Sequence, residues 1–162
     1  KNLLGVAEEF ASTDKNIKVK LLGKGYTNIT REVKDQLQSK EGQEMYEFSR
    51  LILKNEKPLV LNYSYVSSEI GKLVETLDLR SDKVFAYFEN CGYKMTHAQQ
   101  EISADICGKL EAQILDYKEG SPIVKVHRVT YLDSGDPLLY EISYYRGDLY
   151  KYNIKLLRNK RR

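Results

Sequence analysis

The chain has 162 residues, of which 41% are hydrophobic and 30% are charged, with both charge signs spread along it. This size and composition fit one globular domain with a single core, and they exclude a disordered or fibrous chain. The longest apolar runs are far shorter than the roughly 20 residues that span a bilayer, so we expect no membrane segment and no secretion leader.

The charge distribution argues against a nucleic-acid-binding body. The formal net charge of +3 comes from 26 basic and 23 acidic residues. Four of the basic residues are Arg158, Lys160, Arg161 and Arg162, a run that is typical of a solvated tail. The rest of the chain is close to neutral, whereas a DNA- or RNA-binding surface needs a concentrated basic face.

The sequence also gives little support for a metal site or a catalytic nucleophile. The 2 cysteines, Cys91 and Cys107, and the 2 histidines, His97 and His127, lack metal-ligand spacing. We therefore expect reduced thiols in a cytoplasmic protein, with neither a metal nor a cofactor. Neither a Gly-rich phosphate loop nor a nucleophile with a paired base is visible, which argues against acyl-transfer enzymes.

The first half of the chain mixes strand and helix patterns. Residues 1–14 have no firm period and are interpreted as a linker or a frayed helix end. A period-two pattern predicts a strand over 16–22, which Gly23 and Gly25 should end. Thr30 as N-cap predicts a helix over 31–40, stopped by Gly42. Two further strands are predicted over 45–53 and 58–66.

Two short helices and several strands complete the pattern. Ser67 or Ser68 should cap a helix with apolar residues at Ile70, Leu73, Val74 and Leu77. Ser81 with Asp82 should cap a second helix that ends near Gly92. The remaining elements are strands over 100–106, 123–132, 137–146 and 149–157, with a helical turn over 109–115. The class is α+β, an antiparallel sheet with helices on one side or at the ends.

An internal echo links two of the predicted hairpins. The strand with Arg50, its turn and the Pro58 strand correspond in register to the strand with Arg128, its turn and the Pro137 strand. We interpret them as related hairpins that face each other, with pseudo-twofold symmetry, around a shared pocket.

The order of elements and several short motifs resemble the UTRA effector-binding domain of HutC-subfamily, GntR-type transcriptional regulators. The motifs include Ile-Val-x-Val-x-Arg from Ile123, Asp-Ser-Gly-Asp-Pro over 133–137 and, most specific, Tyr-Arg-Gly-Asp-Leu-Tyr over 145–150. The resemblance implies a chorismate-lyase-like fold over residues 15–162 and a homodimer. It also implies that residues 1–14 end a linker from a missing N-terminal winged helix-turn-helix domain, through which a repressor binds DNA.

The resemblance also implies an effector site. Carried over by position, its residues are Arg50, Asn62, Lys83, Val84, Phe85, Glu141 and Tyr145. A second arginine, common in members that sense sugar phosphates, is Ile52 here, and a family glutamate is replaced by Asn62. The late acidic position falls on Leu139 or, in a shifted register, on Glu141. The implied effector is a small anionic metabolite, a phosphosugar or a carboxylate.

Physical arguments support part of this site. A helix that begins at Asp82 or Lys83 offers unpaired backbone N–H groups to an anion. A guanidinium on an apolar strand face needs an acceptor, which for Arg50 is a ligand or an internal carboxylate such as Glu141 or Glu101. Tyr145 lies on a ligand wall or on a solvated outer face. Three further residues are expected to be structural: Arg146 and Asp148, which brace their turn, and His127.

The sequence therefore predicts an effector-binding and dimerisation domain, not an enzyme. Two alternatives stay open. One is a chorismate-lyase-like enzyme acting on a small aromatic dicarboxylate, and the other is a dimerisation module with a vestigial pocket.

Overall fold

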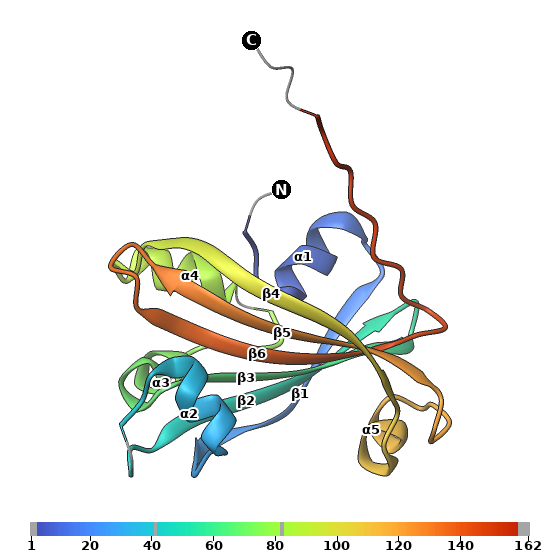
Figure 1. Cartoon of the computed structure of the whole chain (residues 1–162), viewed down its shortest axis with the longest axis horizontal. Helices are drawn as coiled ribbons and strands as arrows, with labels where there is room; N and C mark the ends of the chain where they lie inside the picture. The colour runs from blue at the N-terminus through green and yellow to red at the C-terminus, as the bar shows by residue number, and fades with distance from the viewer. Residues whose placement is uncertain (1–2, 41, 82, 159–162) are drawn as a thin grey trace.

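The structure is a computed structural model that describes residues 3–40, 42–81 and 83–158. Within these ranges, one antiparallel sheet of six strands has the order β1-β2-β3-β6-β5-β4 (Figure 1). The strands are β1 (Ile17–Thr27), β2 (Met45–Lys54), β3 (Lys57–Ser67), β4 (Met95–Ile106), β5 (Pro122–Leu132) and β6 (Pro137–Arg146). The helices are α1 (Val6–Thr13), α2 (Arg31–Leu37), α3 (Ser68–Val74), α4 (Val84–Asn90) and α5 (Lys109–Ile114). The predicted α+β class is confirmed.

Helices cover both faces of the sheet, and the prediction of helices on one side or at the ends is wrong. α1, α3 and α4 pack on the face that carries Phe48 and Ile52. α2 and α5 pack on the opposite face, which carries Met45 and Leu51. β2 and β6 are buried along nearly their whole length, so each of their faces needs a cover. No helix in the described ranges is long and apolar enough to span a bilayer.

The sheet consists of two three-stranded halves that meet where β3 pairs with β6. The related hairpins therefore lie side by side in one sheet, and the expectation that they face each other around a pocket is wrong. Their register supports the pseudo-twofold relation. Asn62 pairs with Ser143, and Ser64 pairs with Glu141. The echo matches Asn62 to Glu141 and Ser64 to Ser143. The pseudo-twofold axis therefore maps the Asn62–Ser143 pair onto the Glu141–Ser64 pair.

Three strand predictions need correction, namely those over 149–157, 16–22 and 100–106. Residues 151–158 form no strand, and the chain leaves the sheet there as an extended tail (Figure 1). β6 is already paired with β3 and β5, so a strand returning from the Gly147 turn finds no free edge beside it. At the other end of the sheet, β1 continues past Gly23 and Gly25 to Thr27 through a bulge after Leu21. An edge strand tolerates such a bulge because only one side of it is paired.

The helix boundaries depend on caps, and two of the predicted caps are confirmed. The hydroxyls of Thr30 and Ser67 accept hydrogen bonds from the N–H groups of Val33 at 3.5 Å and Ile70 at 3.3 Å. α2 ends at a left-handed Gln38, before the predicted stop at Gly42.

The remaining helix predictions need correction or go untested. Leu77 is buried but lies beyond α3. The N-cap of α4 is Lys83, not Ser81, and Asp82 lies outside the described residues, as do Lys160, Arg161 and Arg162 of the basic tail. The predicted strand over 100–106 begins earlier, at Met95. No helix was predicted at the position of α1, because residues 1–14 were interpreted as a linker or a frayed helix end.

Candidate functional site

Buried polar side chains cross the apolar face of the sheet beneath α1. Arg50 on β2, Asn62 on β3 and Ser143 on β6 are successive cross-strand neighbours. Ser64 and Glu141 form the next pair on the same face. Arg50 is 4% exposed, Asn62 0% and Glu141 1%. Residues of one cross-strand row project from the same face, so the register alone brings these groups together.

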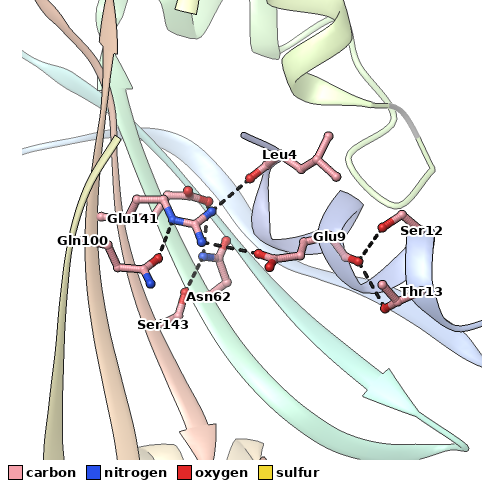
Figure 2. Close-up of polar contacts among 9 residues, drawn as sticks. Leu4, Glu9, Ser12, Thr13, Asn62, Gln100, Glu141 and Ser143 are labelled. Carbon is pink, nitrogen blue, oxygen red and sulfur yellow. Dashed lines mark hydrogen bonds and ion pairs between the residues drawn. The ribbon is translucent and has the colours of Figure 1, made fainter. Parts of the chain in front are cut away.

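Asn62 holds most of this row in one hydrogen-bond network (Figure 2). Its side-chain amide donates to Ser143 Oγ at 3.0 Å and to Glu141 Oε1 at 3.5 Å. The hydroxyl of Ser64 donates to Asn62 Oδ1 at 2.9 Å. Glu141 Oε2 has no partner among the described residues, so the network leaves one buried acceptor unsatisfied.

Arg50 is the exception in the row, because its guanidinium has no hydrogen bond or ion pair to any described residue. Nε is buried without a partner, and Cζ lies 5.3 Å from the centroid of the Phe48 ring. Burial lowers the pKa of Arg50, and the charges of Glu141 and Glu8 partly offset that shift. A guanidinium keeps its proton at neutral pH even so. The internal ion pair with Glu141 or Glu101, which was the alternative to contact with a ligand, is not formed.

Arg50 lines a cavity of about 240 Å³ between α1, β1 and the residues that precede α4. Its charged lining residues are Glu8, Arg50, Arg80 and Lys83. A much smaller hollow of about 10 Å³ shares Glu8 and Arg50 with it and adjoins Phe85 and Glu141. These two spaces share lining residues, and we refer to them together as the Arg50 cavity.

The cations of the Arg50 cavity differ in how they are paired. Arg80 binds Asp78 through two hydrogen bonds, of 2.9 and 3.1 Å, to its carboxylate. Lys83 is exposed and forms no ion pair within the described ranges. Arg50 and Lys83 are therefore the two cationic groups of the cavity that lack an ion-pair partner.

One backbone N–H at the start of α4 is paired within the protein, whereas the sequence predicted unpaired N–H groups there. The backbone N–H of Phe85 donates to Glu8 Oε1 at 2.9 Å. Burial raises the pKa of Glu8, while the hydrogen bond from Phe85 and the charges of Arg50 and Lys83 partly offset the shift. A carboxylate of the protein itself therefore accepts a hydrogen bond that was expected to go to a bound anion.

The structure brings most of the predicted site residues together. Those that line the Arg50 cavity are Arg50, Lys83, Val84, Phe85 and Glu141. Leu139 lines it as well, so both registers considered for the late acidic position reach the same hollow. Asn62 lies behind Glu141 and reaches the cavity only through their hydrogen bond.

Tyr145 lies apart from the Arg50 cavity, and this placement differs from the prediction of a shared ligand wall. Its buried ring packs between Phe10 of α1, with centroids 6.1 Å apart, and Tyr150, at 4.1 Å. Burial raises the pKa of the Tyr145 hydroxyl well above its usual range. The residue belongs to the apolar cluster beneath the far side of α1.

Sequence reasoning missed the role of Arg128, although the echo already matched it with Arg50. Arg128 donates to Gln100 Oε1 at 2.9 Å, to the Leu4 carbonyl at 3.0 Å and to Glu9 Oε2 at 3.4 Å (Figure 2). It lines a second hollow of about 540 Å³ on the other side of α1. Because this guanidinium is fully partnered, we assign its role to holding α1 and place the candidate site at the smaller Arg50 cavity.

Three predicted structural residues behave as expected. Arg146 donates to both carboxylate oxygens of Asp148, at 3.1 and 2.8 Å, and so braces its own turn. His127 Nδ1 hydrogen-bonds the hydroxyl of Tyr140 within the sheet. Among the described residues, no group of three or more His, Cys, Asp or Glu side chains could hold a metal ion.

Comparisons with known proteins cover most of the chain. The family model for the UTRA domain matches residues 12–151. The HTH-type transcriptional repressor NagR of Bacillus subtilis is 26% identical over 109 residues, which are 67% of this chain and 44% of NagR. The chain therefore spans less than half the length of this relative.

Solved structures share the fold at low identity. The effector domain of PhnF from Mycobacterium smegmatis has a TM-score of 0.81 at 15% identity, with 88% of each chain covered. A GntR-family transcriptional regulator from Enterococcus faecalis has a TM-score of 0.67 at 16% identity, covering 86% of this chain and 98% of that one. At this identity the likeness shows the fold alone.

Proposed function

The chain belongs to the UTRA domain family, whose model covers residues 12–151, and we propose that it binds a small anionic metabolite as the effector domain of a GntR-type transcriptional regulator. The proposed binding site is the Arg50 cavity. The proposed activity is binding without turnover, because the regulators that the chain resembles act by binding.

The unpaired guanidinium of Arg50 carries this proposal. A desolvated charge without an acceptor costs several kcal/mol, so a buried arginine normally has an internal carboxylate beside it. Arg50 is 4% exposed and has no such partner among the described residues. An acidic group of a ligand would supply the missing acceptor, and Lys83 would add a second positive charge.

Glu141 supports a second feature of the effector. Its buried Oε2 is an acceptor without a donor, and it adjoins the same cavity as Arg50. A hydroxyl or amine on the ligand would satisfy it. An effector with one acidic group and at least one hydroxyl or amine fits both unsatisfied atoms, which agrees with the expected phosphosugar or carboxylate.

We also propose a homodimeric repressor that binds DNA through a domain outside this chain. NagR, of which the chain covers 44%, is described as an HTH-type repressor. Apart from its C-terminal basic run the chain is close to neutral, and this composition does not favour a nucleic-acid-binding surface within it.

The test is a thermal-shift screen of the 162-residue chain against phosphosugars and carboxylates. A ligand at a hundred times its Kd should stabilise the fold by about 2.7 kcal/mol, which appears as a raised melting temperature. We expect Arg50→Met to lose this shift and Arg128→Met to keep it, since Arg128 lies outside the cavity.

Two results would contradict the proposal. One is a screen in which no anionic compound stabilises the wild-type chain. The other is an undiminished shift in Arg50→Met. Release of pyruvate from chorismate would instead favour the enzyme alternative.

A further inference from the structure

Glu8 places a carboxylate inside the Arg50 cavity. Its Oε1 accepts the hydrogen bond of Phe85 N–H at 2.9 Å, and Glu8 lines both spaces of the cavity together with Arg50. The positive charges of Arg50 and Lys83 both act on it. An acidic group of a bound effector would seek these same partners.

The charges of the cavity balance only while Glu8 stays inside. Arg50 and Lys83 are its unpaired cations, Glu8 and Glu141 are its carboxylates, and Arg80 is bound to Asp78. An additional anion would bring a third negative charge to two positive ones. A ligand acid therefore fits electrostatically only in exchange for Glu8.

The volume of the cavity leads to the same conclusion. Ligand cavities usually measure about 300 to 1,000 Å³, and the main part of this one measures about 240 Å³. Much of its lining comes from α1 and the residue before its N-cap: Leu4, Ala7, Glu8, Ala11 and Ser12. A sugar-sized ligand would need α1 to move outward.

α1 is suited to such a movement. It has 8 residues, its N-cap Gly5 provides no side-chain hydrogen bond, and its last turn has no basic residue. A helix of this length is not stable alone in water, so its order depends on contacts with the sheet. The contacts include the burial of Val6 and Ala7, the bonds from Arg128 and the bond from Phe85 to Glu8.

We propose that Glu8 is an internal substitute for the acidic group of the effector, and that binding replaces Glu8 and releases α1 from the sheet. This inference rests on the proposed function. It identifies the bound group as a carboxylate or phosphate that takes over the partners of Glu8, and it identifies α1 as the element that reports occupancy.

The experiment is an NMR titration of the chain with inorganic phosphate, which follows the Phe85 amide and the hydrogen exchange of the α1 amides. Glu8→Ala removes both the competing carboxylate and the acceptor for Phe85, so phosphate has no internal group to displace, and we expect it to bind about tenfold more tightly than to wild type. In the wild type, saturating phosphate should shift the Phe85 resonance and increase exchange in α1.

Glu89→Ala is the matched control. It makes the same charge change at an exposed position of α4, outside the cavity lining, so phosphate affinity should stay at the wild-type value. Equal affinities of wild type and Glu8→Ala would overturn the inference, as would unchanged α1 protection at saturation or no phosphate binding to Glu8→Ala. These failures are distinct from failure of the proposed function, which is judged by metabolite stabilisation of the wild type and its loss in Arg50→Met.

Discussion

Gly71 shows how one residue position sets the distance between a helix and the sheet. A Cβ added there would lie 2.4 Å from Cβ of Tyr46, closer than real Cβ contacts come. α3 can therefore pack on β2 only because residue 71 has no side chain. The helix pattern predicted α3 but gave no sign of this approach, since the distance depends on a residue 25 positions earlier in the chain.

The corresponding prediction is that Gly71→Ala destabilises the fold by about 1 to 3 kcal/mol, because overpacking forces α3 away from the sheet. Urea unfolding would measure this. Gly23→Ala is the control, since its added Cβ would meet only Ser49 Oγ at 3.7 Å. A Gly71→Ala variant as stable as Gly23→Ala would show that α3 moves outward at no cost.

The sequence predicted several residues of the site, but it did not predict which of them pair with one another. The unusual position of Arg50 on an apolar strand face was visible in the sequence, and the structure shows it buried. Its lack of a partner was not visible, because Glu141, Glu8 and Glu101 were all available along the chain. Only the tertiary arrangement decides which carboxylate comes within hydrogen-bonding distance of which donor.

At the scale of elements, α1 combines weak local signals with decisive tertiary contacts. Residues 1–14 lack a firm period, and no side-chain cap marks the start of the helix. Burial of Val6 and Ala7 on the sheet and the bonds from Arg128 and Phe85 hold it in place. The tail over 151–158 is the opposite case, since it has a strand-like sequence but no strand edge to pair with.

The docking of α1 should depend on pH through Glu8. Burial raises the pKa of its carboxyl above the usual 4.5, so the docked state binds the proton more tightly than the free helix does. This contribution favours docking fully below pH 4.5 and is lost as the pH rises through the docked pKa. Arg50, Lys83 and Glu141 are the charged groups that face Glu8 and set the size of the shift.

Hydrogen-exchange protection factors of the α1 amides, corrected for intrinsic exchange, would measure this dependence. We expect them to decrease between pH 4 and pH 7 in the wild type relative to Glu8→Gln, in which residue 8 does not titrate. Parallel profiles for the two proteins would show that Glu8 does not control docking.

At the scale of the whole molecule, the seam between β3 and β6 joins the two halves of the sheet. Asn62 lies at this seam and is completely buried. Its amide contacts Ser64 on its own strand, and Ser143 and Glu141 on β6. The network therefore adds side-chain hydrogen bonds to the backbone pairing of β3 with β6, which joins the two halves of the sheet.

We expect Asn62→Ala to destabilise the whole domain by about 1 to 3 kcal/mol, because it leaves the buried groups of Ser143 and Glu141 unsatisfied. Equilibrium unfolding in urea would measure the loss. Ser64→Ala should cost less, since it removes one donor and leaves the bonds of Asn62 to β6 in place. Equal effects of the two variants would argue against a special role of the seam.

The sequence by itself determined the α+β class, most strand positions, two helix caps and five of the residues that line the Arg50 cavity, because local periodicity, capping chemistry and short motifs are properties of neighbouring residues. The tertiary structure alone decided that helices cover both faces, that the two hairpins join edge to edge and that residues 149–157 stay unpaired. It also decided that Glu8 occupies the site and that Arg50 remains without a partner. These outcomes depend on which strand edges are free and which charges meet in a buried space, and both are set by contacts between residues far apart in the chain.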